Sequence, residues 1–183
     1  MGTPSTSAEV RQDPFELLGL KARYDLDVAE LEARHRELSR ALHPDRFQGR
    51  SASERRQALG KAIEVNEALR ALKDPVQRAE ALLRRRGVTV GETREPQADP
   101  EFLMTVMELR EALRDAHKSS DVSRVETLCD EVKQRQASAE SEFTNGLTDA
   151  GAASPERLVA LLGELRYYRR FFDEAHAILD ELS

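Results

Sequence analysis

Apolar residues recur at steps of three and four positions over most of the chain, which is the spacing of one face of an α-helix. Residues that cap or break helices separate the runs of this pattern. The first run, residues 13–20, is short, with Asp13 suited to an N-cap, Pro14 to the first turn and Gly19 to the end. The chain is also rich in the strong helix formers Ala, Leu, Glu and Arg, so we predict an all-α fold.

A second helix is predicted from Asp27, its N-cap, to Leu42. Arg36 and Arg40 lie one turn apart on the side roughly opposite its apolar face. Pro44 ends the helix, because proline cannot continue it and pushes the preceding residue out of the α region. The inward face is predicted to consist of Val28, Leu31, His35, Leu38 and Leu42.

Two further helices follow a loop at residues 47–50. Either Ser51 or Ser53 suits the cap of a third helix that runs through Lys73, and a fourth begins at Asp74-Pro75 and ends before Gly87. We interpret its terminal arginines as cations that complement a helix C-terminus, and not as a nucleic-acid patch. The inward residues of the third helix are predicted to be Leu59, Ala62, Val65, Ala68, Leu69 and Leu72.

The domain organisation follows from where this periodicity is missing. Residues 1–12 are small and polar, and we expect a disordered tail there. Residues 87–98 contain two glycines and a proline without periodicity, which favours a linker. The helical segment 13–86 then forms one domain. Residues 99–183 contain three helices with short connections, which predicts an antiparallel three-helix bundle.

The helices of this bundle carry more apolar surface than one core face needs. Leu103, Met104 and Met107 fall away from the core face of the first bundle helix, and Tyr167, Phe171 and Ile178 fall away from that of the last. We weigh a partner surface against burial inside the protein for these residues. The predicted core faces are Phe102, Val106, Leu109 and Leu113; Val122, Val125, Cys129, Val132, Gln136, Ala139 and Phe143; and Leu158, Leu161, Leu165, Tyr168, Phe172 and Leu179.

Composition excludes several functional classes. The net charge of −6 disfavours a nucleic-acid binder, and no run of about 18 apolar residues that could cross a membrane is present. The single cysteine, Cys129, excludes a disulfide framework, and we expect its thiol to be buried and unreactive. No phosphate loop or nucleophile motif occurs, and the four scattered histidines propose no metal site. We therefore expect a protein that is not an enzyme and that has no catalytic residues, cofactor or metal.

One loop stands out as a candidate binding site. His43, Pro44 and Asp45 lie between two helices that should pair antiparallel, and the proline rigidifies the loop. A histidine and a carboxylate are thus presented with little ordering on binding. With Arg36, Arg40 and Arg46 alongside, the loop is typical of a docking surface, although an ordinary interhelical turn is the alternative.

The surroundings of this loop resemble the J-domain of the DnaJ family from Asp13 to about Arg86. The resemblance implies docking onto a DnaK-type heat-shock chaperone and stimulation of its ATP hydrolysis by His43, Pro44 and Asp45. Arg36, Arg40 and Arg46 would attract an acidic face of the ATPase. His35 departs from the family, which usually has an aromatic residue there. The matching runs are Asp13-x-Phe15-x-Leu17-Leu18-Gly19-Leu20, His43-Pro44-Asp45-Arg46-Phe47 and Val65-Asn66-Glu67-Ala68-Leu69-x-x-Leu72-x-Asp74-Pro75.

The remaining chain resembles the HscB co-chaperones of iron–sulfur cluster assembly. The resemblance implies an L-shaped protein whose bundle binds the IscU-type iron–sulfur scaffold protein. The scaffold-binding residues carried over by position are Leu103, Met104, Met107, Glu108, Glu111, Arg166 and Tyr167. The matching runs are Pro75-x-x-Arg78-Ala79-Glu80-x-Leu82-Leu83, Phe102-Leu103-Met104-x-x-Met107-Glu108-Leu109-Arg110-Glu111-x-Leu113 and Leu165-Arg166-Tyr167.

The resemblance therefore implies a cytoplasmic co-chaperone that delivers the scaffold to a DnaK/HscA-type chaperone and promotes cluster assembly and transfer. We expect a monomer without nucleic-acid or membrane partners, with a weak homodimer as the alternative. Two other functions stay open at this point. One is a J-domain co-chaperone for an unrelated client, and the other is a structural helical interaction protein.

Overall fold

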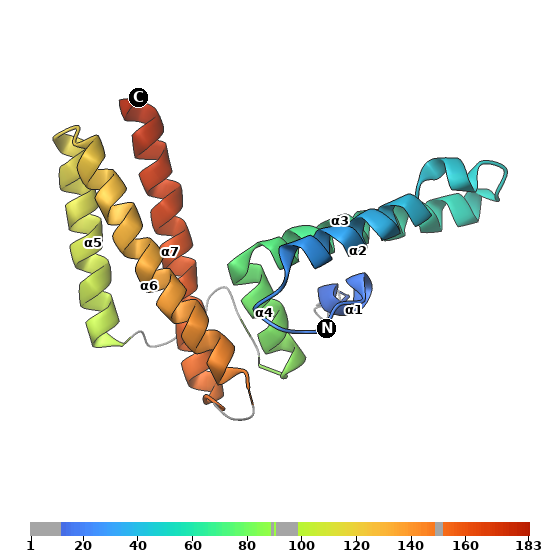
Figure 1. Ribbon diagram of the computed structural model, residues 1–183, viewed down its shortest axis with the longest axis horizontal. Helices are drawn as coiled ribbons and strands as arrows, with labels where there is room; N and C mark the ends of the chain where they lie inside the picture. The colour runs from blue at the N-terminus through green and yellow to red at the C-terminus, as the bar shows by residue number, and fades with distance from the viewer. Residues whose placement is uncertain (1–11, 89, 91–98, 149–151) are drawn as a thin grey trace, which may run out of the picture. The chain divides into compact units, whose positions relative to one another are not determined.

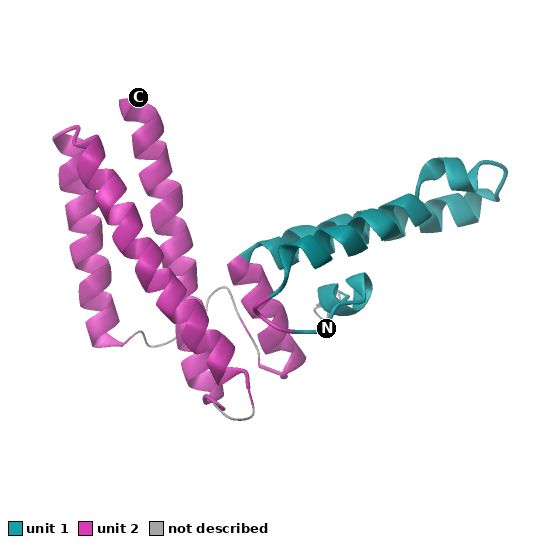
Figure 2. Ribbon diagram, in the orientation of Figure 1, with its two compact units in different colours: residues 1–22, 26–74 teal, residues 23–25, 75–183 magenta. Residues whose placement is uncertain are grey.

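The computed structural model describes residues 12–88, 90, 99–148 and 152–183, and these residues form helices and no strands. The chain divides into two compact units, which Figure 2 distinguishes by colour. Unit 1 consists of residues 1–22 and 26–74, and unit 2 of residues 23–25 and 75–183. The predicted tail at 1–12 and the predicted linker at 87–98 lie almost entirely outside the described residues.

Unit 1 is a helical pair with a short helix packed against it (Figure 1). Its elements are α1 (Pro14–Leu18), α2 (Val28–Ala41), the 3-10 helix η1 (Pro44–Phe47) and α3 (Ala52–Lys73). The predicted caps form: the Asp13 carboxylate accepts from the Phe15 N–H at 2.9 Å, and Gly19 ends α1 with a left-handed φ of 65°. Ser51 and Glu54 form a capping box at the start of α3. Local capping chemistry therefore sets where these helices begin and end.

The core of unit 1 lies between α1, α2 and α3, and it is smaller than the sequence pattern predicts. Its buried side chains are Phe15, Leu18, Leu20, Leu31, Ala58, Val65, Ala68 and Leu72. Two predicted inward residues are exposed instead, Val28 at 53% and Leu59 at 61%. A two-helix pair with one short helix on it covers only part of each helix circumference. The outer turns of α2 and α3 consequently keep apolar residues in solvent.

His35, at the position where the DnaJ family usually has an aromatic residue, joins α2 to α3 through polar contacts. The His35 imidazole Nε2 lies 2.9 Å from Asn66 Oδ1 and 3.3 Å from the Ser39 hydroxyl. Nearby, Lys73 Nζ lies 2.6 Å from a Glu32 carboxylate oxygen. This hydrogen bond and the lysine charge lower the pKa of Glu32. The half-buried His35 is thus a satisfied polar residue at the edge of the helix pair.

Unit 2 contains α4 (Pro75–Arg85), α5 (Pro100–Lys118), α6 (Val122–Gly146) and α7 (Pro155–Leu182). The last three form the predicted three-helix bundle, and α4 packs on α7 (Figure 1). Tyr24 also belongs to this unit, because its ring meets Phe143 edge-on at 5.1 Å and the Arg78 guanidinium lies over it. The boundary between the compact units therefore falls at Pro75, before α4, whereas the sequence analysis places the domain boundary after it.

The buried face of α7 turns along the helix and includes residues from both apolar faces that the sequence predicts. Leu158, Leu161 and Leu165 are buried as predicted, but Phe171 and Ile178 are buried where Phe172 and Leu179 were expected. A stripe drawn at a constant angle assumes one packing partner along the whole helix. Because α7 packs on α4, α5 and α6, different faces are covered along its length.

A similar shift occurs on α6. Leu128 is buried beside Val125 and Val132, whereas Cys129 is only half-buried and Val122 is exposed. The expectation of a fully buried thiol is therefore wrong. Burial and the neighbouring acidic residues still raise the pKa of Cys129, which disfavours its reactive thiolate.

Candidate functional site

The predicted docking loop of unit 1 forms the tip between α2 and α3. Pro44 occupies the first turn of η1, and the His43 carbonyl accepts from the Arg46 N–H at 2.9 Å. His43 Nδ1 lies 3.4 Å from both the backbone N–H and a carboxylate oxygen of Asp45. The His43 and Asp45 side chains are 59% and 73% exposed. The backbone of the tip is therefore ordered by its own hydrogen bonds while its functional groups face solvent.

The three predicted arginines are exposed around this tip. Arg36 forms an i, i+4 ion pair with Glu32 at 3.6 Å, and Glu32 is shared with Lys73. Within the described ranges, no ion pair involves Arg40 or Arg46. The tip can thus offer unneutralised guanidinium groups to an acidic protein surface, and the exposed Asp45 carboxylate to hydrogen-bond donors or cations of a partner.

Unit 2 carries a groove of about 740 Å³ between α5 and α7, with Glu80 of α4 at its edge. Tyr167 lies along the groove and is 9% exposed, with its hydroxyl donating to the Val106 carbonyl at 3.2 Å. The Phe102 ring meets Tyr167 edge-on at 5.8 Å. Burial raises the pKa of Tyr167, so the phenol stays neutral and keeps its donor.

The predicted scaffold-binding residues divide between this groove and the outer side of α5. Leu103, Arg166 and Tyr167 line the groove. The other four lie on the exposed surface of α5, where Met104 is 64% and Met107 is 71% exposed. Leu103 is 48% exposed and connects the two parts. At about 100° per residue, these positions form one continuous face from the lip of the groove outwards. The outward residues are Met104, Met107, Glu108 and Glu111.

Two of the predicted contact residues also hold unit 2 together. The Arg166 guanidinium is 2.8 Å from a Glu80 carboxylate oxygen and so ties α7 to α4, with both side chains at most one-fifth exposed. Tyr167, through its bond to Val106, ties α7 to α5. Of the two possibilities that the sequence left open for Tyr167, a partner surface or burial, the structure shows a buried ring that meets Phe102 of α5 edge-on.

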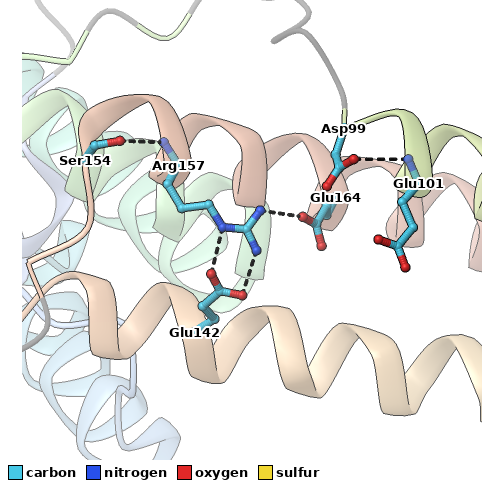
Figure 3. Close-up of polar contacts among 6 residues, drawn as sticks. All are labelled: Asp99, Glu101, Glu142, Ser154, Arg157 and Glu164. Atoms are coloured by element: carbon cyan, nitrogen blue, oxygen red, sulfur yellow. Dashed lines mark hydrogen bonds and ion pairs between the residues drawn. The ribbon is translucent and has the colours of Figure 1, made fainter.

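A cluster of polar contacts surrounds Arg157 near the start of α7 (Figure 3), and three of its members, Asp99, Arg157 and Glu164, also line the groove. The Arg157 guanidinium is 2.7 Å from both carboxylate oxygens of Glu142 on α6 and 3.3 Å from Glu164 on α7. Asp99 caps α5 there, and Ser154 caps α7. The pKa of Glu142 is lowered by its bond to Arg157, whereas burial raises that of Glu164. Arg157 therefore holds the start of α7 against α6.

Sequence analysis missed the other arginines that line this groove. Arg110 of α5 and Arg170 of α7 lie near Tyr167 at the end away from Arg157. A helical projection gives a usable signal for one of them, because Arg110 falls about 20° from Leu103 on α5. The contacts of Arg157 were also missed. Its partners Glu142 and Glu164 lie 15 residues before it and 7 residues after it, and these separations are too long for a local sequence pattern to indicate both.

Features of a metal site or of a membrane span are absent from the described residues. In residues 12–88, 90, 99–148 and 152–183, no three histidine, cysteine or acidic side chains gather as a metal site would require. Among the helices described, none combines the length and the apolar character needed to cross a membrane.

Comparisons with known proteins find relatives of this chain. A family model described as "HSCB C-terminal oligomerisation domain" matches residues 98–176. A co-chaperone protein HscB homolog of Shewanella halifaxensis (strain HAW-EB4) is 33% identical over 169 residues, which cover 92% of this chain and 97% of that protein. A homolog of the same name from Vibrio campbellii (strain ATCC BAA-1116) is 38% identical over 160 residues, covering 83% of this chain and 91% of the relative.

Two solved structures have the same fold. Chaperone HscB from Vibrio cholerae superposes with a TM-score of 0.78 at 30% identity, covering 93% of this chain and 99% of that one. Human co-chaperone protein HscB superposes with a TM-score of 0.81 at 24% identity, covering 96% of this chain and 83% of the human chain. The human structure, at this identity, supports the fold alone.

Proposed function

Because the chain belongs to the HscB family of co-chaperones, we propose that it delivers an IscU-type iron–sulfur scaffold protein to a DnaK/HscA-type heat-shock chaperone. As a member of this family it is not an enzyme, and its role is that of a co-chaperone in iron–sulfur cluster assembly. ATP hydrolysis belongs to the chaperone, and this protein shifts the populations of the chaperone's conformations. We place this activity in the cytoplasm.

The tip of unit 1 supports the chaperone half of this proposal. Asp45 offers a carboxylate that is 73% exposed on a backbone ordered by η1, so docking orders few groups. Arg40 and Arg46 supply positive charge close by that no described carboxylate neutralises. Such charges increase the rate of encounter with an acidic surface more than they increase final affinity. We assign chaperone binding to His43, Pro44, Asp45, Arg36, Arg40 and Arg46.

The exposed face of α5 supports the scaffold half. Leu103, Met104 and Met107 are large apolar side chains that the folded chain leaves in solvent, with Glu108 and Glu111 beside them. Exposed apolar residues rimmed by charge mark protein-binding surfaces. Methionine also adapts its shape to a partner at low energetic cost. We assign scaffold binding to Leu103, Met104, Met107, Glu108, Glu111, Arg166 and Tyr167.

The observation that carries the proposal is that one chain bears both surfaces, each on its own compact unit. A chain that binds two partners at once raises the effective concentration of one at the other, up to millimolar values for short flexible linkages. The residues of each proposed surface all belong to one unit. The two activities can therefore be removed one at a time.

The experiment is the steady-state ATPase rate of the heat-shock chaperone from the same organism, measured with this chain and with or without the scaffold. Asp45→Asn should abolish the stimulation and leave scaffold affinity unchanged. Leu103→Ala with Met107→Ala should weaken scaffold binding about 30-fold, as truncation of hot-spot residues does. The stimulation by that variant in the absence of scaffold should persist.

Asp180→Asn is the matched control for the tip, because it makes the same substitution at an exposed residue of α7. It should leave both readouts unchanged. Full stimulation by Asp45→Asn would contradict the chaperone half of the proposal. Unchanged scaffold affinity of the Leu103 and Met107 variant would contradict the scaffold half and favour a co-chaperone for another client.

A further inference from the structure

Two arginines line the groove of unit 2 without an acidic partner in the described part of the chain. Arg157 is held by Glu142 and Glu164, and Arg166 by Glu80. Arg110 and Arg170 line the same groove, are exposed, and form no ion pair in the ranges that the structure describes. These two guanidinium groups are therefore available to a ligand.

The two arginines lie on the same side of Tyr167. Helices α5 and α7 run parallel, since Tyr167 contacts Val106 and, further along, His117 lies 3.2 Å from Glu181. Arg110 follows Val106 by one turn, and Arg170 follows Tyr167 by about one turn. Burial has the largest effect on the Tyr167 phenol and raises its pKa, and Glu174 acts in the same direction. The positive charges of Arg110 and Arg170 act in the opposite direction, which shows that both lie near the phenol. They thus occupy the end of the groove opposite Arg157.

The floor of the groove beside them is apolar. Phe102, Val106 and Tyr167 form it, and Leu103 lies at its lip. One acidic residue, Glu174, also lines this end, and its charge can offset only one of the two arginine charges. An apolar floor with two guanidinium groups at its end fits an apolar side chain next to a carboxylate. Guanidinium groups pair with carboxylates in two-pronged geometry, and they do so more strongly where water is partly excluded.

We propose that Arg110 and Arg170 bind a carboxylate of the scaffold partner, whose neighbouring apolar side chain rests on Leu103 and Tyr167. This inference rests on the proposed function and adds the chemistry of the bound segment. The outer side of α5 carries Glu108 and Glu111, so the two sides of the binding face have opposite charge. A partner must therefore present positive charge to the glutamates and negative charge to the arginines. This requirement favours one orientation of the partner and disfavours the reversed orientation.

The test is isothermal titration of this chain with the scaffold protein of the same organism at several NaCl concentrations. Arg110→Gln with Arg170→Gln should weaken binding about tenfold, the effect of losing roughly 1.4 kcal/mol of charge-assisted bonding. It should also make the affinity less sensitive to NaCl, because fewer charges remain to be screened. Arg110→Glu with Arg170→Glu should weaken binding further.

Arg124→Gln is the matched control, since Arg124 is an exposed arginine of α6 outside the groove. It should change neither the affinity nor the NaCl dependence. Because Arg110 and Arg170 are exposed and unpaired within the described residues, their substitution should leave the unfolding midpoint in urea unchanged. The single variants, Arg110→Gln and Arg170→Gln, should each lose about half as much binding free energy as the double variant, which is about threefold in affinity.

Three results would overturn the inference. If the double Gln variant binds as wild type while Leu103→Ala with Met107→Ala loses affinity, the proposed function stands and the carboxylate site is wrong. If wild type binds no scaffold, both proposals are wrong. If sedimentation shows a dimer of this chain that the double Gln variant abolishes while its scaffold affinity is unchanged, the occupant is a second copy.

Discussion

The two candidate surfaces obtain their order in different ways. At the tip of unit 1, Pro44 and the hydrogen bonds of η1 fix the backbone, and the side chains of His43 and Asp45 reach into solvent. In the groove of unit 2, the side chains themselves are fixed, because Tyr167 is buried against Phe102 and bonded to Val106. One surface is shaped by backbone conformation and the other by packing.

This difference decides which substitutions isolate function from folding. An exposed side chain on an ordered backbone can be changed with little effect on stability. A side chain that lies in the groove and also joins two helices affects both properties at once. The tip is therefore a surface whose residues can be tested singly, whereas Tyr167 needs paired variants to separate its two roles.

The largest predicted effect comes from such a pair at Tyr167. Tyr167→Ala should lower the free energy of unfolding by about 3 kcal/mol, because it removes a large buried ring and leaves a cavity. Tyr167→Phe keeps the ring and removes only the bond to the Val106 carbonyl, so the loss should be about 1 kcal/mol. Urea unfolding followed by circular dichroism measures both values.

Met107→Ala is the control for this pair, since Met107 is 71% exposed and its truncation should change stability by less than about 0.5 kcal/mol. If packing of the ring shapes the groove, Tyr167→Phe should retain scaffold affinity, because it keeps the ring and removes only the hydroxyl. A strong loss of scaffold binding in Tyr167→Phe, without a loss of stability, would mean that the partner contacts the hydroxyl directly.

Sequence reasoning succeeded where the cause of a structure is local. The N-cap acids Asp13, Asp27, Asp99 and Asp121 accept from backbone N–H groups at the starts of their helices, as the pattern of cap and following residues predicts. The helix starts and the all-α class follow from such short-range chemistry. The exposure of Leu103, Met104 and Met107 was also predicted, because the α5 pattern depends on a single core face.

Sequence reasoning stayed incomplete where several distant segments share one residue. For Phe171 and Ile178 it left burial and a partner surface open, because the choice requires knowing that α7 packs on α4, α5 and α6. The contact of Arg166 with Glu80 could not be predicted, because Glu80 lies 86 positions earlier in the chain. The tip needed no such information, since its geometry is set within η1 itself. The roles of the predicted contact residues stay predictions until binding is measured.

A second prediction concerns two helical glycines, one in each unit. A methyl group on Gly146 would lie 2.8 Å from the Ala153 Cβ and 3.1 Å from Leu158 Cδ2. Neither the short Ala153 side chain nor its backbone can rotate away, so Gly146→Ala should destabilise unit 2 by about 1–3 kcal/mol. At Gly60 in α3, an added Cβ meets nothing within 4 Å.

Gly60→Ala should therefore stabilise unit 1 by about 0.5–1 kcal/mol, because alanine favours the helix more than glycine does. Hydrogen exchange resolved by residue would assign each change to its unit. Equal effects of the two substitutions would contradict the close approach of Ala153 to α6. Chaperone stimulation by Gly60→Ala should equal that of wild type, because the tip is unaltered.

The smallest predicted effect concerns pH and the two carboxylates that share Arg157. The bond to Arg157 lowers the pKa of Glu142 below its ordinary value of 4.5, so this residue stabilises the fold above that pH and loses its contribution as pH falls. Burial raises the pKa of Glu164, and the charge of Glu142 adds to the effect. Ionised Glu164 therefore destabilises the fold at neutral pH, and protonation relieves this cost.

The matched variants should consequently shift stability in opposite directions. At pH 7, Glu142→Gln should lose about 0.5–1 kcal/mol, the value of a well-oriented surface ion pair, whereas Glu164→Gln should be more stable than wild type. On acidification, the difference between Glu164→Gln and wild type should begin to decrease first, at a pH above 4.5, because the pKa of Glu164 is raised, and it should be lost as the pH falls below 4.5. The difference for Glu142→Gln should persist to pH values below 4.5, since Glu142 keeps its charge longer. Urea midpoints between pH 3 and 7 distinguish these outcomes. If the two variants gave parallel pH profiles, the pKa values of Glu142 and Glu164 would not be shifted in opposite directions, and the prediction would be wrong.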